Sequence, residues 1–245
     1  MKQNKYDDPN FFAAYSAMPR SVEGLVKAGE WETFRSMLPD LTGKRVLDLG
    51  CGFGWHCRYA RELGARAVVG VDISENMLSR AHELTNDPAI EYRLGAVEDV
   101  DVVDGEFDVV ISSLALHYVA DIGIVFETVS RGLRPGGAFV FSVEHPIFTS
   151  RAEQDWWRGD DGRLLHWPVD GYQDEGMRRT NWLAVDVVKY HRTLSTYVNS
   201  LVQSGFRILE AREPGPSEEM VRANPDMADE ARRPMFLLMS AVRAT

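Results

Sequence analysis

Cysteine and long apolar runs are both scarce in this chain of 245 residues. Its two cysteines, Cys51 and Cys57, cannot form a disulfide framework or a four-cysteine zinc site, and we expect no bound metal. No apolar stretch approaches the roughly 18 residues that a membrane helix requires. The polar N-terminal residues 1–10 show no signal-peptide pattern. These absences predict a cytoplasmic globular protein with no membrane partner.

Positively charged residues are also few, because the chain has 27 lysines and arginines but 37 aspartates and glutamates, which gives a net charge of −10. An acidic surface repels phosphate backbones, so we expect no nucleic-acid partner unless a local basic patch exists. Hydrophobic residues make up 44% of the chain, which is enough for a normal core. The length fits one domain, or one domain with a sizeable insertion.

Short apolar runs alternate with segments of helical spacing over the first 145 residues. We expect strands at 46–49, 67–71, 90–94, 107–111 and 138–143. Helices are expected at 21–38, at 56–63, after the capping residue Ser74, and at 122–133. Strands that alternate with helices predict an α/β fold with a doubly wound, mostly parallel sheet.

The pattern changes after residue 145. Residues 146–181 are polar and rich in tryptophan, and 182–190 reads as a strand that could pair with 164–169. A helix over 194–201, two strands at 206–210 and 235–242, and a surface loop at 213–234 complete the chain. We therefore expect one domain with an N-terminal helical cap (1–43), a core (44–145), a substrate-side insertion (146–192) and a C-terminal part (193–245).

A glycine-rich turn follows the first expected strand, and its spacing is informative. Gly50, Gly52 and Gly54 give G-x-G-x-G, whereas a dinucleotide fingerprint has G-x-G-x-x-G. Asp48 stands two residues before Gly50, where a carboxylate would oppose a pyrophosphate but would suit a cationic ligand. Asp72 ends the second strand, where an acid accepts hydrogen bonds from ribose hydroxyls. The pattern favours a cationic nucleoside without phosphates, a description that S-adenosylmethionine fits.

Four stretches resemble the motifs of class I S-adenosylmethionine-dependent methyltransferases, in the same order and spacing over about residues 44–145. They read VLDLGCGFG (46–54), VGVDIS (69–74), FDVV followed by SSLALH (107–117), and LRPGG (133–137). The resemblance implies a seven-stranded, Rossmann-like methyltransferase sheet whose last strand is antiparallel, with an inserted lid. It also implies S-adenosyl-L-methionine as cofactor and S-adenosyl-L-homocysteine as product.

The resemblance assigns cofactor contacts position by position. The glycine turn would line the methionine part of the cofactor and Asp48 would lie near its amino group. Asp72 would bind the ribose, Ile73 and Met77 would flank the adenine, and Ser112 and His117 would lie near the ribose and sulfonium. Many relatives have an aspartate where this chain has Ala96, so Val97 or Glu98 would meet the adenine instead. The residues so assigned are Asp48, Gly50, Cys51, Gly52, Gly54, Asp72, Ile73, Met77, Val97, Glu98, Ser112 and His117.

The N-terminal segment has two interpretations. Tyr15 and Arg20, with Tyr6, Phe11 and Phe12, would either form a lid over the cofactor carboxylate or belong to a helix packed on the sheet edge. The tryptophans of the insertion also have two interpretations, because they would either pack a small lid or form an aromatic wall for the substrate. We expect at least half of them to pack the lid.

A histidine is the first candidate for a catalytic base. His145 precedes Pro146, and the residue before proline stays extended, so we expect His145 to project at the carboxyl tip of the fifth strand. Its neighbour Glu144 would then point to the opposite side. His191 is a second candidate, since it ends a late strand and would either face the cleft or cap the next helix. Either histidine would orient or deprotonate the acceptor.

The motif after the fourth strand limits the classes of methyl acceptor that the resemblance allows. The resemblance excludes amino-group methylases of nucleic acid and protein, because residues 112–115 read SSLA rather than their proline-rich motif. It excludes cytosine-carbon methylases, because neither cysteine follows a proline, and metal-dependent catechol-type enzymes, because Ser112 stands where they have an acid. A small-molecule acceptor with an oxygen or nitrogen nucleophile remains. The alternatives are a cofactor-binding scaffold, a methyltransferase acting on a macromolecule, and a nucleotide-linked oxidoreductase, and an oligomer is possible.

Overall fold

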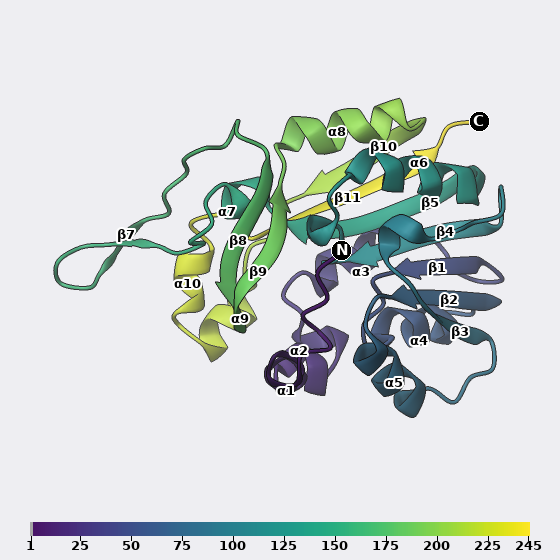
Figure 1. Ribbon diagram of the computed structural model, residues 1–245, viewed down its shortest axis with the longest axis horizontal. Coiled ribbons are helices and arrows are strands. Elements are labelled where there is room, and N and C mark those ends of the chain that lie inside the picture. Colours follow the sequence, from purple (N-terminus) through teal and green to yellow (C-terminus); the bar gives the residue numbers. More distant parts are fainter. Residues whose placement is uncertain (1) are drawn as a thin grey trace.

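The structure, a computed structural model that describes residues 2–245, is built on one seven-stranded sheet (Figure 1). The strand order is β10-β11-β5-β4-β1-β2-β3. The strands are β1 (Arg45–Leu49), β2 (Ala67–Asp72), β3 (Ile90–Leu94), β4 (Phe107–Ser113), β5 (Leu133–Glu144), β10 (Phe206–Arg212) and β11 (Phe236–Arg243).

The direction of the strands confirms the expected fold class. The pairs β1–β2, β1–β4, β2–β3 and β4–β5 are parallel, whereas β11 runs antiparallel to both β5 and β10. Six of the seven residues of β4 are buried, as is typical of a parallel strand covered on both faces. The carboxyl ends of β1, β2, β4 and β5 therefore meet at one edge, where doubly wound sheets bind ligands.

Helices cover both faces of the sheet (Figure 1). On one face, α6 (Ile122–Gly132) and α8 (Leu194–Gln203) bury apolar side chains such as Phe126 and Leu201 against β5 and β11. On the other face, α3 (Trp31–Met37), α4 (Trp55–Glu62) and α5 (Glu75–Leu84) bury Phe34 and Leu78 in a second core. The Ser74 hydroxyl accepts a hydrogen bond from the Met77 amide, so this residue caps α5 as expected.

The predicted continuous helix over 21–38 is wrong. The structure has α1 (Pro9–Ser16), α2 (Pro19–Val22), the 3₁₀ turn η1 (Leu25–Lys27) and α3. Gly24 interrupts the helical run with a φ of 79°, and the Trp55 ring lies 2.8 Å from the position that a Cβ would take there. The tertiary contact with α4 therefore divides a segment whose periodicity favoured one helix.

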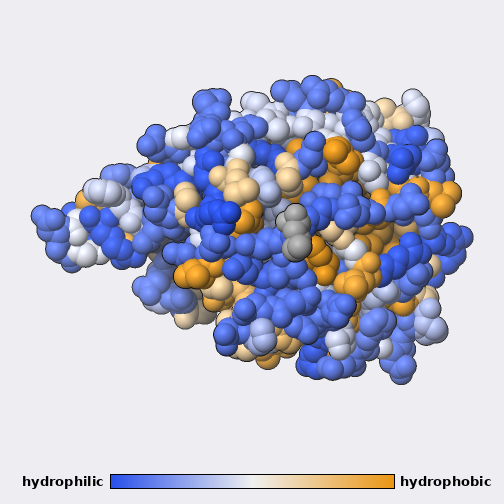
Figure 2. Space-filling model, viewed as in Figure 1, coloured by the Kyte–Doolittle hydropathy of each residue, from blue (hydrophilic) through white to orange (hydrophobic). Residues whose placement is uncertain are grey.

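The predicted pairing inside the insertion is also wrong. The late strand β9 (Ala184–His191) pairs with β8 (Gly176–Trp182), while β7 (Leu164–His166) pairs with β6 (Trp157–Arg158). Only Leu183 separates β8 from β9, and a short connection costs the least loop entropy. The β6–β7 segment forms an arm that projects from the body and is largely hydrophilic on the face shown in Figure 2.

Short helices complete the chain: η2 (Val97–Asp99), η3 (Leu116–Tyr118), α7 (Pro146–Thr149), α9 (Glu218–Ala223) and α10 (Met227–Glu230). The last two lie in 213–234, which was predicted to be a loop without secondary structure. Within the described residues, no helix combines the length and the hydrophobicity needed to cross a membrane.

Candidate active site

A cavity of about 440 Å³ opens at the carboxyl edge of the sheet, a volume within the range of small-molecule sites. Three parts of the chain enclose it. The floor comes from the glycine turn and the ends of β2, β4 and β5, one wall from the N-terminal segment, and the opposite wall from the β8–β9 hairpin. Predicted cofactor residues that line it are Tyr15, Arg20, Gly50, Gly52, Asp72, Ile73, Met77, Val97, Glu98 and His117.

The glycine turn has backbone angles that favour glycine. Gly50 has a φ of 76°, and a Cβ there would lie 2.3 Å from the Cβ of Ala115. Gly52 lies beside the cavity and its amide donates a 2.8 Å hydrogen bond to the Asp72 carboxylate. Gly54 begins α4 outside the cavity lining, and a Cβ there would lie 2.0 Å from the Tyr92 hydroxyl. Two glycines thus shape the cavity, and the third accommodates the packing of Tyr92.

Asp72 joins the turn to the end of the cavity where the resemblance places the nucleoside, called the nucleoside end below. Its two carboxylate oxygens accept hydrogen bonds from the amides of Gly52, at 2.8 Å, and Ser74, at 3.0 Å. Burial raises the pKa of Asp72 to about 6, although these amide bonds oppose the shift. A carboxylate oxygen has two lone pairs, so both oxygens can still accept a further bond from a ligand.

Asp48 lies beneath the turn rather than in the cavity lining. The Cys57 thiol donates to its Oδ2 at 3.2 Å, and its Oδ1 has no hydrogen-bond partner among residues 2–245. Burial raises the pKa of Asp48 to about 7. A buried carboxylate oxygen without a partner is costly, and a cationic group above it would relieve that cost.

Two other predicted contacts lie outside this cavity. Ser112 is fully buried, and its hydroxyl donates a 2.7 Å hydrogen bond to the Leu49 carbonyl, so it fixes β4 to β1. Cys51 lines a smaller adjoining cavity of about 50 Å³, together with Tyr15 and Arg20. Burial raises the pKa of the Cys51 thiol to about 11, so it stays protonated at neutral pH.

The N-terminal segment covers the cavity, which favours the lid interpretation over simple packing. Tyr6, Phe11, Tyr15 and Arg20 line the cavity, and the Arg20 guanidinium lies 3.3 Å from the Glu30 carboxylate. Phe12 instead packs edge-on against Phe53, with the two ring centroids 5.9 Å apart.

Residues 2–8, which we call the strap, cross the cavity and are held at both sides. Asp7 accepts hydrogen bonds from the Ser74 hydroxyl at 2.6 Å and from the Asn76 amide at 3.1 Å, at the start of α5. On the far side the Gln3 side chain bonds to the backbone of Asp186 and Val188 in β9. Sequence reasoning did not identify these anchors, because no local pattern links a polar N-terminal segment to a distant hairpin.

The two histidines proposed as bases do not enter the cavity lining as the structure describes it. The His145 ring lies on the opposite side of β5, where its Nδ1 accepts from the Ile147 amide at 3.0 Å and its Nε2 lies 2.6 Å from Glu213. The buried His191 ring bonds through Nδ1 to the Thr149 hydroxyl and through Nε2 to the Tyr172 carbonyl. Both rings have structural partners, so the expectation that they face the acceptor is not met.

Comparison with known proteins identifies the family. The methyltransferase domain family matches residues 47–141. A solved S-adenosylmethionine dependent methyltransferase of Mesorhizobium loti is 48% identical and superposes with a TM-score of 0.84, covering 90% of this chain and 100% of that one. The chain belongs to the class I S-adenosylmethionine-dependent methyltransferases.

Two curated relatives add detail to this assignment. The methyltransferase is 33% identical, over 247 residues, to an uncharacterized protein of Haemophilus influenzae, covering 98% of this chain and 97% of that protein. It is 38% identical over 105 residues to the ubiquinone biosynthesis O-methyltransferase of Nitrobacter winogradskyi, which is 42% of this chain and 40% of that protein. This second match spans less than half of either protein.

The cavity of the methyltransferase fits its cofactor, S-adenosylmethionine. Asp72 offers free lone pairs at the nucleoside end, and Ile73, Met77 and Val97 give that end apolar walls. The buried, unpartnered Oδ1 of Asp48 lies beneath the turn, in keeping with a cationic ligand above it. The cofactor supplies an electrophilic methyl group on a sulfonium.

The remaining end of the methyltransferase cavity is lined by the half-buried Glu144 and Gln154 and the buried Lys189, which form a polar cluster with the buried Thr180 behind them. The Lys189 ammonium lies 2.6 Å from Glu144 Oε1 and donates to Gln154 Oε1 at 3.1 Å. Gln154 also donates to Glu144 Oε2 at 3.0 Å and accepts from the Thr180 hydroxyl at 3.0 Å. Sequence reasoning assigned none of these residues to the site, and it had placed Glu144 on the wrong side of β5.

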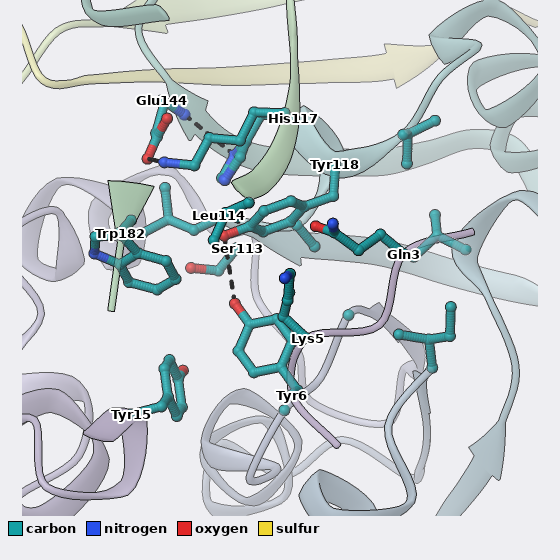
Figure 3. A pocket seen from close by; sticks show the side chains of 18 of the residues that line it. Gln3, Lys5, Tyr6, Tyr15, Ser113, Leu114, His117, Tyr118, Glu144 and Trp182 are labelled. Carbon is teal, nitrogen blue, oxygen red and sulfur yellow. Dashed lines mark hydrogen bonds and ion pairs between the residues drawn. The ribbon is translucent and has the colours of Figure 1, made fainter. Parts of the chain in front are cut away.

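His117 lies beside this cluster, and Figure 3 shows the two side chains of Glu144 and His117 at the same end of the cavity. The His117 Nδ1 accepts a 3.4 Å hydrogen bond from the Glu144 amide. Burial lowers the pKa of His117 to about 4, so the ring is neutral near pH 7 and its proton lies on Nε2. His117 therefore presents a hydrogen-bond donor rather than a base.

Aromatic side chains surround the space between the two ends (Figure 3). The hydroxyls of Tyr6 and Tyr118 lie 3.5 Å apart, and Trp182 faces Tyr15 with ring centroids at 6.4 Å. Of the four tryptophans in 156–182, Trp182 lines the cavity, whereas Trp156 and Trp167 pack around the buried Arg233 guanidinium. Packing thus accounts for at least half of them, as expected.

Proposed function

We propose that this methyltransferase transfers the methyl group of S-adenosylmethionine to an oxygen or nitrogen atom of a small molecule. The observation that carries the proposal is the enclosure of the cavity by the strap and the β8–β9 hairpin. Such an enclosure excludes water and suits a small acceptor better than a macromolecule. The partial likeness to an enzyme named for ubiquinone biosynthesis supports a small-molecule acceptor.

In this proposal the chain's own residues act mainly by alignment. Asp72, Ile73, Met77, Val97 and Glu98 hold the nucleoside, while Gly50, Gly52 and the buried Asp48 hold the amino-acid part with Tyr15 and Arg20. Tyr6, Tyr118 and Trp182 confine the acceptor in line with the methyl group. Alignment and water exclusion are effective for a displacement whose leaving group is already good.

The first test measures S-adenosylhomocysteine binding by calorimetry. Asp72→Ala should weaken binding by about 1–3 kcal/mol, because the ligand loses a buried hydrogen-bond acceptor. Asp121→Ala is a matched control, since Asp121 caps α6 through the amides of Gly123 and Ile124, away from the cavity lining. Equal affinities in wild type and Asp72→Ala would contradict the role given to Asp72.

A further inference from the structure

The acceptor end of the cavity contains one carboxylate among the described residues. Of the acids that line the cavity, Asp72 and Glu98 lie at the nucleoside end, at the ends of β2 and in η2, whereas Glu144 ends β5 at the opposite end. Resting on the methyl transfer proposed above, we propose that the acceptor is a hydroxyl compound and that Glu144 takes the proton from its hydroxyl group.

None of these three histidines, His117, His145 and His191, is placed to take the proton from the acceptor. His145 and His191 have both ring nitrogens engaged outside the cavity. His117 reaches the cavity, but its Nδ1 accepts the Glu144 amide, so its Nε2 carries a proton and cannot take another. The free lone pairs at this end therefore belong to Glu144, each of whose carboxylate oxygens accepts a single bond from the cluster.

The charge of the cluster distinguishes a hydroxyl from an amine. Lys189 places a buried ammonium 2.6 Å from Glu144, so a protonated amine would enter beside a like charge. A neutral amine attacks through its nitrogen lone pair and becomes an ammonium, which loses its proton only after the methyl group has been transferred, so the transfer itself needs no base. A hydroxyl group is neutral when it binds and must lose its proton during methylation. The Glu144 carboxylate beside the Lys189 ammonium can accept that proton.

The proposed step balances in atoms and charge. A lone pair of the acceptor oxygen forms the bond to the methyl carbon, and the carbon–sulfur bond breaks with its electron pair left on sulfur. The hydroxyl proton passes to Glu144, which later releases it to water. A low carboxylate pKa suffices, because an oxygen that is gaining a methyl group becomes a much stronger acid than a carboxylic acid.

The backbone of Gln154 gives independent evidence that the cluster is held in place. Gln154 has a φ of 48°, a left-handed conformation that is uncommon for a residue other than glycine. Its side chain bonds to Glu144, Lys189 and Thr180. Strained residues of this kind persist where surrounding contacts hold them, often at ligand clamps, so we assign Gln154 and Lys189 as positioning residues for Glu144.

The groups facing Glu144 come from several elements. Burial raises the pKa of Glu144, whereas His117 of η3, in the acidic range where its ring is protonated, and Lys189 of β9 lower it, and the net shift is downward. Burial raises the pKa of Tyr118 in η3 and of Tyr197 in α8, and the charge of Glu144 adds to both shifts, so both hydroxyls remain protonated near pH 7. Turnover that depends on Glu144 should therefore stay level from pH 6 to 9.

The decisive experiment compares matched acceptors with purified full-length protein and S-adenosylmethionine. The probes are pairs that differ in one group, phenol against aniline and 4-hydroxybenzoate against 4-aminobenzoate, supplemented with simple alcohols and hydroxy acids, with S-adenosylhomocysteine as the measured product. We expect methylation of at least one hydroxyl member and not of its amine partner. Turnover of amines alone, or of no hydroxyl compound in the panel, would overturn the proposal.

Variants then separate proton transfer from charge balance. With the hydroxyl acceptor found in this way, Glu144→Gln should lower kcat by about 10²–10⁴, the usual span for a positioned base, with cofactor affinity unchanged. Because this change leaves Lys189 unpaired, the double variant E144Q/K189M restores a neutral cluster and should stay equally slow. Recovery of turnover in the double variant would mean that Glu144 only neutralises Lys189, and would overturn its role as base.

The pH profile supplies a readout that a purely structural role would not move. Wild-type kcat should be level between pH 6 and 9, whereas a histidine base would lose activity below about pH 6.5. A loss centred there in wild type would also contradict the proposal. Failure of the methyltransferase assignment itself would appear differently, as absence of S-adenosylhomocysteine binding in the wild-type protein.

Discussion

At the end of β5, the alternation of side chains decides which of two neighbouring residues points into the cavity. Side chains alternate along a strand, so Glu144 and His145 must point to opposite sides. Phe141 and Val143 belong to the core beneath α6 and α8, which places His145 toward that face and Glu144 with Ser142 on the cavity side. The alternation of apolar and polar residues before Glu144 is the signal that could have identified the cavity residue.

The position of His145 leads to a prediction about stability rather than catalysis. Its Nδ1 accepts from the Ile147 amide and so caps α7. His145→Ala should destabilise the protein by about 1 kcal/mol, the usual cost of losing a cap, while kcat stays within about twofold of wild type. His145→Asn should recover stability, since asparagine is a good cap. Chemical denaturation and turnover measure the two effects, and a large loss of kcat at unchanged stability would contradict this assignment.

The strap is the element that joins the two halves of the site. Asp7 binds the start of α5, which carries the predicted adenine contact Met77, and Gln3 binds the edge of β9, which carries Lys189. A ligand bound at either end of the cavity is therefore covered by the strap, which is anchored at both ends of the cavity. Release of the strap should expose both ligands to water.

Asp7 offers a test of the strap with a neighbouring control. Asp7→Ala removes the bonds to the Ser74 hydroxyl and the Asn76 amide, so affinity for S-adenosylhomocysteine should fall by about 5- to 30-fold, equivalent to about 1–2 kcal/mol. Asp8→Ala removes a carboxylate one residue away that caps α1 instead. Calorimetry on both variants decides the matter, and an equal loss in Asp8→Ala would attribute the effect to α1 rather than to the link with α5.

Buried acids couple the site to the stability of the whole molecule. Burial raises the pKa of Asp48 from 3.8 to about 7 and that of Asp72 to about 6. A raised acid pKa means that the folded state holds a proton which the unfolded state has lost, so stability from these groups falls as pH rises from about 4 to 7. His56 acts in the opposite direction, because burial lowers its pKa to about 3 and its contribution is lost as pH falls below 6.5.

The variant Asp48→Asn isolates the contribution of Asp48. Asparagine resembles the protonated acid, so the two proteins should have similar free energies of unfolding at pH 4.5. At pH 8 the variant should be the more stable by about 2–4 kcal/mol, because the wild type then carries a buried charge. Urea denaturation of the ligand-free proteins across this range measures the difference, and a pH-independent gap would show that Asp48 keeps its ordinary pKa.

The cofactor half of this methyltransferase was predictable from local sequence. A short buried strand, a glycine turn and an acid at the end of the next strand act within about 30 residues, and their chemistry does not depend on distant segments. The alternation of strands and helices predicted the mostly parallel sheet, and the family resemblance implied its seven strands. The structure places ten of the predicted cofactor residues around one cavity. Asp48, Cys51, Gly54 and Ser112 lie behind or beside that cavity, because the turn itself packs against β3 and β4.

The acceptor half was decided only by tertiary structure. Glu144, Gln154 and Lys189 are separated by up to 45 residues, and they meet because β9 folds back onto the end of β5. The strap reaches β9 across more than 180 residues of sequence. No local periodicity encodes these contacts, since they depend on which strands pair and on how an insertion closes over the sheet. Local sequence therefore predicted the residues assigned to the nucleoside, and tertiary packing determined the end of the cavity where we propose that the acceptor binds.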